Sequence, residues 1–236
     1  SCHFRNNEYM KALESFEYII SQKQNFFTEE ALLKAARIHY QNNNYNKALE
    51  NYQKLEDIAN EKSVVMESRI YIMRCYAHLN NYEKTIEAVE TLLNTDKVTK
   101  GVEREARFEK AMAFYHKEKW DEAIDAFDLI VHDVKSNEGA EAKFRIAEIY
   151  YKKGELKEAK KVILDFSDKN TPHQYWLAKS FILLADIYAQ EENEFQAIHT
   201  LKSIIKNYDT QDDGIIDTAQ RKKEQLVEQQ ENEEDL

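Results

Sequence analysis

Side chains suited to binding a ligand recur on one helical stripe of this 236-residue chain. The stripe combines arginine, tyrosine, other apolar and carboxylate side chains at spacings of four and three residues. Arginine can hold a carboxylate through two hydrogen bonds, and tyrosine offers apolar area together with a hydroxyl group. These residue types favour an extended peptide or a partner helix as the ligand. The candidate ligand-binding residues are Arg37, Tyr40, Arg74, Phe108, Met112, Tyr115, Phe144, Glu148, Tyr151 and Asp186.

The charge at the middle position of this stripe changes along the chain. It is positive at Arg37 and Arg74, neutral at Met112, and negative at Glu148 and Asp186. If the stripe lines a groove, this order predicts a groove that is cationic at one end and anionic at the other. Opposite ends would then attract oppositely charged parts of one ligand.

Two interpretations of the stripe involve no ligand. Its charges can be solvated, or they can be paired between adjacent helices, for example Arg37 and Arg74 with Glu30 and Glu67. Its apolar members can serve mainly to pack neighbouring repeats: Leu33, Ile70, Phe108, Phe144 and Ile182.

Catalytic chemistry finds little support in the sequence. The seven histidines form neither an HExxH pair nor a Cys/His cluster with zinc-ligand spacing. There is no glycine-rich phosphate loop and no serine elbow. His78 and His116 occupy equivalent places in adjacent repeats, and we interpret both as surface histidines. We therefore expect a chain that is not an enzyme and that holds no metal or cofactor.

The composition indicates long helices joined by short turns. A third of the residues are charged, and there are only four glycines and one proline, which is too few for many strands and hairpins. The formal net charge of −11 would repel phosphate backbones, so we expect no nucleic-acid partner. No apolar run approaches the length of a membrane span, so we expect no direct membrane insertion.

A repeat of 36 to 38 residues organises the chain. Small residues recur near the start of the second helix of each unit, and we call this position the second-helix slot: Ala12, Ala48, Thr85, Ala123, Ala159 and Ala197. A first-helix slot lies twelve residues before each of the last five: Ala36, Met73, Ala111, Ala147 and Ala185. An aromatic or aliphatic residue precedes the second-helix slot by three in most units, but in the last unit it shifts by one to Phe195.

This framework of small and aromatic residues resembles the tetratricopeptide repeat family, over nearly the whole chain to about residue 208. The resemblance implies an all-α fold, a right-handed α-solenoid of helix pairs whose first helices line the concave side. It also implies a non-enzymatic scaffold that binds a protein or peptide on that side. An alternative function is a structural spacer or self-assembly segment of a larger multi-repeat protein. The long polar connections resemble bacterial cell-envelope scaffolds, which favours the periplasm or envelope over the cytoplasm.

The sequence predicts three segments. The repeat array covers residues 1–208 with a truncated first unit, a capping helix lies within 209–227, and residues 228–236 form an acidic, disordered tail. The expected helices of the array beyond the first unit span 29–42, 45–60, 64–79, 82–95, 102–118, 120–134, 138–153, 156–167, 172–190 and 194–207.

The first residues predict a chain that begins inside a first helix, because Ser1 to Tyr9 align in register with Arg37 to Tyr45. We expect a fragment of a longer array, and a lipid anchor on Cys2 is the alternative. Cys2 and Cys75 fall two repeats apart, beyond disulfide reach, and are expected to be reduced core residues. Apolar residues at such an end predict self-association through the truncated N-terminal end: Phe4, Tyr9 and Phe16.

Overall fold

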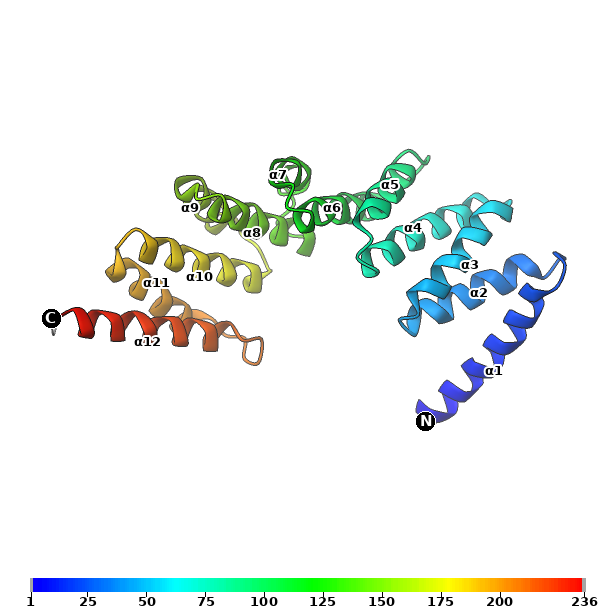
Figure 1. Cartoon of the computed structure of the whole chain (residues 1–236), viewed down its shortest axis with the longest axis horizontal. Coiled ribbons are helices and arrows are strands. Elements are labelled where there is room, and N and C mark those ends of the chain that lie inside the picture. Colours follow the sequence, from blue (N-terminus) through cyan, green and yellow to red (C-terminus); the bar gives the residue numbers. More distant parts are fainter. Residues whose placement is uncertain (1, 235–236) are drawn as a thin grey trace. The chain divides into compact units, whose positions relative to one another are not determined.

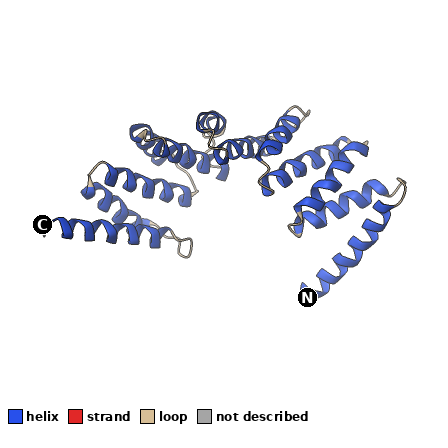
Figure 2. Ribbon diagram, in the orientation of Figure 1, coloured by secondary structure: helices blue, strands red, loops and turns tan. Residues whose placement is uncertain are grey.

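The computed structural model describes the backbone from Cys2 to Glu234 and the side chains from Lys11 to Glu231. Over this part the chain forms twelve α-helices and no strand. Figures 1 and 2 show how the helices follow one another along the chain. The predicted all-α fold is therefore confirmed. The helices are α1 (Cys2–Ser21), α2 (Thr28–Gln41), α3 (Tyr45–Ile58), α4 (Lys62–His78), α5 (Tyr82–Leu93), α6 (Lys100–His116), α7 (Trp120–Asp128), α8 (Asn137–Lys152), α9 (Leu156–Ser167), α10 (Gln174–Gln190), α11 (Glu194–Asn207) and α12 (Ile215–Glu234).

The helices form two compact units. Unit 1 comprises residues 1–119 with α1 to α6, and unit 2 comprises residues 120–236 with α7 to α12. In unit 1 each helix packs against the next, and α4 also contacts α6. In unit 2, α7 packs on α8, α8 pairs with α9, α10 pairs with α11, and α12 covers both α11 and α10. We call α2, α4, α6, α8 and α10 the first helices, and α3, α5, α7, α9 and α11 the second helices.

The small residues of the repeat lie where helices meet. Every first-helix slot is at most 1% exposed: Ala36, Met73, Ala111, Ala147 and Ala185. The second-helix slots beyond the first are equally buried: Ala48, Thr85, Ala123, Ala159 and Ala197. Thr85 is accommodated because its hydroxyl donates a hydrogen bond to the carbonyl of Asn81 at 2.9 Å. Close approach at these slots produces the stacked helix pairs of the α-solenoid class; the right-handed sense stays a prediction.

Each first helix beyond the N-terminal one ends in the same hydrogen-bonded turn. The residue five places before the second-helix slot has φ between 54° and 76°, and its N–H and that of the following residue bond back to the last helical turn. This is the Schellman motif, in which glycine is the least strained residue. Only one of the five positions is glycine: Asn43, Asn80, Glu118, Gly154 and Glu192.

We expect Glu192→Gly to stabilise unit 2 by about 0.5–1 kcal/mol, because it removes the left-handed strain of a side chain at this turn. Gly154→Ala at the equivalent turn should destabilise the same unit by a similar amount. Urea unfolding of the two variants measures both effects, and changes of the same sign would contradict the prediction.

His39 lies in the core of unit 1, 4% exposed, with its Nε2 3.2 Å from Oε1 of Glu17. Burial lowers the pKa of His39 below its ordinary 6.5 despite the nearby carboxylate. The folded state therefore holds His39 neutral, whereas the unfolded chain takes up a proton below about pH 6.5. The contribution of neutral His39 to the free energy of unfolding is therefore fully present above that pH. It declines as the pH falls below it.

We expect unit 1 to lose stability between pH 7 and pH 5, and His39→Gln to flatten that decline. Hydrogen exchange of the whole chain at both pH values localises the effect to α2. Equal losses of protection in the wild type and the variant would show that His39 is not the group responsible.

Most helix ends lie within about two residues of the predicted bounds, and the larger differences are at α7, α12 and α1. α7 ends at Asp128 rather than near 134, because residues 130–133 form tight turns whose N–H groups bond to carbonyls three or four residues back. α12 continues to Glu234, beyond the expected end at 227. α1 runs without a break through the segment that the alignment of repeats pairs with the turn after α2.

Cys75 is fully buried and its thiol is free. Burial raises its pKa to about 12, so it is a protonated core residue, as the sequence predicts. The side chains of Cys2, Phe4 and Tyr9 lie outside the described residues. Phe16 is half-buried, and Lys34 Nζ lies 5.7 Å from its ring centre.

Candidate ligand-binding face of the first helices

The two arginines of the predicted stripe bridge adjacent first helices of unit 1. Arg37 of α2 donates from Nε and Nη2 to the two carboxylate oxygens of Glu67 on α4, both at 2.6 Å. Arg74 of α4 makes the same two bonds to Glu105 on α6, at 2.5 and 2.7 Å. These bonds raise the pKa of both guanidinium groups. Pairing between adjacent helices is thus present, with each glutamate one repeat further along than expected.

Paired arginines retain part of their binding capacity. A guanidinium carries five N–H donors, and each bridge occupies two of them. The Arg37 side chain is 50% exposed and that of Arg74 is 29% exposed. The bridges therefore position the arginines for further hydrogen bonds, but they also neutralise most of the positive charge offered to an acidic ligand.

Tyr71 of α4, which the sequence stripe missed, links these groups. Its ring lies 4.8 Å from that of Tyr40, edge to face, and the Arg74 guanidinium lies 5.0 Å from the Tyr71 ring centre. Tyr40 is half-buried, and burial raises its pKa to about 12. Tyr40 therefore contributes its ring edge and hydroxyl to this face as a neutral group.

His78 and His116 have a structural role that the sequence interpretation did not assign. His78 of α4 stacks on Tyr45 of α3 with ring centres 4.3 Å apart, and its Nε2 lies 3.2 Å from the Tyr40 hydroxyl. His116 of α6 stacks on Tyr82 of α5 at 5.1 Å. Each histidine follows its tyrosine by 33 or 34 residues, and this recurrence is the sequence signal that could have identified the pairs.

Phe108 and Met112 meet at a cleft of about 180 Å³ between α4 and α6. Ala77 of α4 lines the same hollow together with these two residues of the predicted stripe. Tyr82 and His116 lie beside them, which places the stacked pair at the edge of the cleft. The other lining residues are Asn80, Thr85, Glu109 and Ala113.

In unit 2 the middle position of the stripe is acidic, whereas in unit 1 it is basic at Arg37 and Arg74. Glu148 of α8 accepts a hydrogen bond from Arg145 on its own helix at 3.0 Å, and Asp186 of α10 accepts from Lys222 of α12 at 2.6 Å. The capping helix is thus tied to the last first helix by an ion pair. Residues 1–119 carry 18 basic and 18 acidic side chains, so the entire net charge of −11 belongs to residues 120–236.

Lys179 occupies the place in unit 2 that Glu67 and Glu105 occupy in unit 1, six residues before the first-helix slot. Its ammonium group lies 4.7 Å from the ring centre of Phe144 and 5.2 Å from that of Trp176. Burial lowers its pKa, and the charge of a nearby arginine lowers it further. Cation–π contacts thus replace the carboxylate bridge between these two first helices.

The ten predicted residues differ in how much surface they offer. Arg37, Tyr40, Arg74, Phe108, Met112 and Tyr115 lie in unit 1, and Phe144, Glu148, Tyr151 and Asp186 in unit 2. Tyr115 and Phe144 are buried, 8% and 5% exposed, because their rings pack in the cores. Tyr151 is half-buried against the core of α8, α9 and α10. Phe108 and Met112 are half-buried and line one hollow together, and Asp186 lines a separate one between α10 and α12.

Other kinds of site find no counterpart in the described part of the chain. Among its residues no three His, Cys, Asp or Glu side chains gather closely enough to hold a metal ion. None of the described helices is both long and apolar enough to cross a membrane.

The fold is similar to solved structures that share little sequence with it. YrrB, a TPR protein described as having an unusual peptide-binding site, has 18% identity and a TM-score of 0.56, over 89% of this chain and 99% of YrrB. The C-terminal part of a TPR repeat-containing protein from Cytophaga hutchinsonii has 16% identity and a TM-score of 0.57, over 94% and 92%. MamA has 14% identity and a TM-score of 0.57, over 78% and 97%. The sequence matches none of the curated proteins compared with it.

The stacked helix pairs and buried slots define an all-α repeat protein of the α-solenoid class. Two stretches of the sequence, residues 30–57 and 74–138, match family models described as Tetratricopeptide repeat. The chain thus contains tetratricopeptide repeats at these residues, the family that its small and aromatic framework predicts.

Proposed function

We propose that the chain is a scaffold that binds a protein or peptide on the concave face formed by its first helices. The single observation that carries this proposal is the cleft between α4 and α6, where Ala77, Phe108 and Met112 meet. An apolar hollow beside an aromatic and histidine edge is the kind of surface that anchors a side chain of a partner.

The cleft suggests what the ligand offers. Its volume of about 180 Å³ suits one large apolar side chain rather than a small-molecule ligand, whose pockets usually occupy about 300–1,000 Å³. Arg74 and Arg37 lie on the neighbouring first helices of the same unit with N–H donors left over from their bridges. We therefore propose an extended peptide or partner helix with an apolar anchor for the cleft and acceptor groups for the arginines.

The proposal includes no catalytic role. The tetratricopeptide family and fold typically serve as non-catalytic scaffolds, and both arginines on this face are held in bridges between first helices. YrrB, which has a similar fold, is described as having a peptide-binding site, and this supports the same kind of role here.

A structural spacer is the second candidate function, and recurring ion pairs between successive repeats favour it. Besides the arginine bridges, Lys160 of α9 donates to both carboxylate oxygens of Glu191 beyond α10, at 2.7 and 2.6 Å. Lys153 lies 2.9 Å from Asp121 at the start of α7. Such bonds resist sliding of one repeat on the next, which a spacer needs and a binding scaffold also uses.

A random-peptide display selection against the whole chain, followed by affinity measurement, tests the proposal. We expect a selected peptide to bind the wild type and to bind Met112→Glu at least about tenfold more weakly, because a charge enters the apolar cleft. Lys54→Ala is the matched control, since it changes the charge by the same amount at an exposed position of α3.

Two outcomes would count against the first-helix face. One is a selection that enriches no peptide with saturable binding. The other is equal affinity of the selected peptide for the wild type, Met112→Glu and Lys54→Ala. Either result would favour the spacer as the function.

A further inference from the structure

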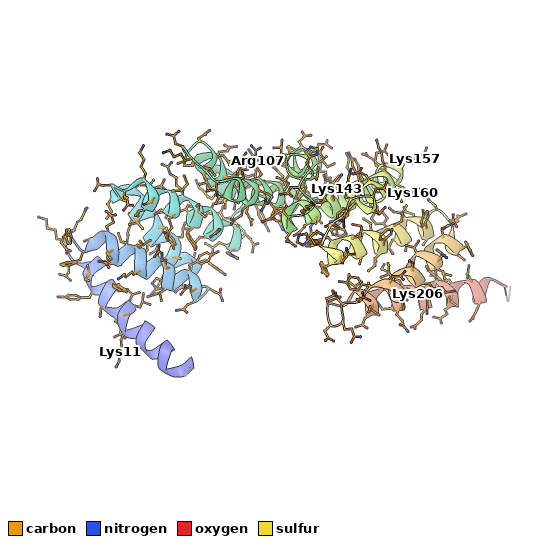
Figure 3. All side chains as sticks on the ribbon, turned by 180° about the vertical axis from the view of Figure 1, so that it is seen from behind. Lys11, Arg107, Lys143, Lys157, Lys160 and Lys206 are labelled. Carbon is orange, nitrogen blue, oxygen red and sulfur yellow. The ribbon has the colours of Figure 1, made fainter. Side chains whose placement is uncertain are left out.

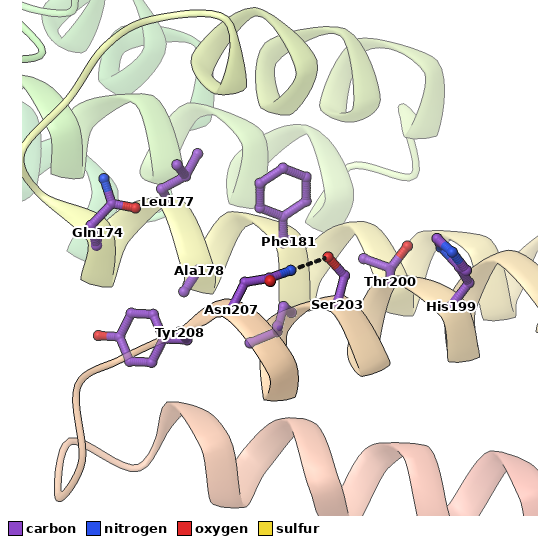
Figure 4. A pocket seen from close by; sticks show the side chains of 10 residues that line it. Gln174, Leu177, Ala178, Phe181, His199, Thr200, Ser203, Asn207 and Tyr208 are labelled. Carbon is purple, nitrogen blue, oxygen red and sulfur yellow. Dashed lines mark hydrogen bonds between the residues drawn. The ribbon is translucent and has the colours of Figure 1, made fainter.

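A second groove lies in unit 2 between α10 and α11, on a different side of α10 from Asp186. Its floor is apolar, formed by Leu177, Ala178 and Phe181 of α10 with Ile204 of α11. Figure 4 shows Leu177 and Phe181 on α10 and, across the groove, the row of side chains from α11. The rim is polar and without carboxylates: Gln174, His199, Thr200, Ser203, Asn207 and Tyr208.

The corresponding position in the three preceding repeats carries a basic side chain. Phe181 stands four residues before the first-helix slot, where those repeats have Arg69, Arg107 and Lys143. Arg69 bridges Glu56 and Thr95, both at 2.7 Å. Arg107 donates to a glutamate on its own helix, and Lys143 of α8 crosses to Asp165 of α9 at 2.6 Å. Among the described residues of unit 2, this position therefore holds an aromatic ring only in the last repeat.

Both partners of the closing ion pair are replaced in the last repeat. Ser203 stands where the preceding repeat has Asp165, six residues after the second-helix slot, just as Phe181 replaces Lys143. Ser203 instead accepts a hydrogen bond from the Asn207 amide at 3.2 Å, along the rim. In the last repeat the ion pair is thus absent, and a groove of about 310 Å³ lies at this place.

The apolar surface continues beyond the groove along α11. Phe195 is 74% exposed and stacks on His199, a rim residue, with ring centres 6.3 Å apart. In most other repeats the aromatic or aliphatic residue near this position lies one place earlier. The shift leaves a large apolar side chain in solvent next to the groove, where packing of the fold does not account for it.

Two lysines of α11 lie next in sequence to residues that line the groove. Lys202 and Lys206 are exposed and lie one helical turn apart. Lys206 is one turn from Ser203 on the rim, and Figure 3 shows it projecting from α11. The carboxylate of Asp213 is bonded to a lining residue. It accepts one hydrogen bond from the Tyr208 hydroxyl and another from the N–H of Ile215.

We infer that this groove docks a segment of a protein partner that presents two large apolar side chains flanked by carboxylates. The apolar side chains enter between Phe181 and Ile204 and extend over Phe195, and the carboxylates lie against Lys202 and Lys206. The groove volume is at the lower end for a ligand pocket, which suits a few side chains of a larger partner. This groove shares no lining residue with the cleft between α4 and α6, so an experiment can refute one proposal and leave the other intact.

Two synthetic helical peptides provide the probes. They carry Leu and Phe four residues apart and differ only in flanking residues, which are Glu in one and Lys in the other. Unit 2 carries the whole net charge of −11, so non-specific attraction favours the Lys-flanked peptide. The inferred site favours the Glu-flanked peptide, because at about 0.15 M salt charges beyond roughly 8 Å are screened and the two lysines dominate locally.

We expect the Glu-flanked peptide to bind the whole chain more tightly, with chemical-shift changes at Phe181, Ser203 and Lys206 in nuclear magnetic resonance spectra. Phe181→Lys combined with Ser203→Asp rebuilds the ion pair of the preceding repeat, so it closes the groove without removing the fold. This double variant should weaken binding at least about tenfold. Lys202→Glu with Lys206→Glu should abolish the preference for the Glu-flanked peptide.

Tighter binding of the Lys-flanked peptide, or no saturable binding of either, would overturn the inference. Unchanged affinity for the double variant would do the same. Met112→Glu should leave the affinity as in the wild type, which separates this groove from the first-helix face.

Discussion

Gly139→Ala is expected to destabilise unit 2 by about 3 kcal/mol, because a methyl group at this position has no space. A Cβ atom there would lie 2.1 Å from the carbonyl oxygen of Asp133 and 3.0 Å from that of Ile130. Both obstacles are backbone, and Asp133 is held in place by a hydrogen bond from Ser136, whose hydroxyl also caps α8 through the Gly139 N–H. The strain can be relieved only by moving the turn between α7 and α8.

Gly101→Ala is the matched control. Gly101 also lies in the first turn of a first helix, α6, but a Cβ there meets nothing within 4 Å. We expect this substitution to stabilise the chain by up to about 1 kcal/mol, as alanine does in open helical positions. Urea unfolding monitored by circular dichroism measures both variants. Equal changes for the two glycines would refute the close approach at Gly139.

Arg74→Glu is expected to destabilise unit 1 by about 2–3 kcal/mol, the second largest effect. The substitution removes two charge-assisted bonds to Glu105 and the contact with Tyr71, and it places two carboxylates opposite each other between α4 and α6. The pair is about three-quarters shielded from solvent, so screening by water reduces the loss only partly.

The double variant Arg74→Glu with Glu105→Arg restores opposite charges in reversed order. We expect it to regain at least half of the lost stability, and hydrogen exchange should show the recovery in α4 and α6. Because the swap preserves the bridge, it also separates folding from binding. A peptide that needs an arginine on α4 should lose affinity for the swapped variant even though its fold is intact. If the double variant instead lost as much free energy of unfolding as the two single variants together, the bridge would not form.

The positions of the helices could be predicted because packing repeats them. A small residue is required wherever two helices approach closely, so Ala111 and Ala123 recur as Ala147 and Ala159 in the next repeat, and all four are fully buried. The early end of α7 could not be predicted in this way. The helix ends at the tight turns of residues 130–133, whose backbone approaches Gly139 closely, and one glycine in the sequence does not reveal which backbone it touches.

The candidate site was predicted as a stripe but not as a set of contacts. The four- and three-residue spacing placed Phe108 and Met112 on one side of α6, where both line the cleft. The partner of Arg37 is the glutamate of α4 that lies opposite it, Glu67. Which residue lies opposite is set by the shift of α4 along α2, and the sequence does not give that shift. Burial of Tyr115 was also beyond the pattern, because a ring at the edge of a stripe can turn toward the core or toward solvent.

Hydrogen exchange of the whole chain with and without a selected peptide tests the central claim most directly. The account predicts that the bound peptide slows exchange in α4 and α6 around Ala77 and Met112, and that Met112→Glu abolishes this protection. Protection confined to the second helices, or binding without any change in α4 and α6, would contradict a ligand-binding face on the first helices.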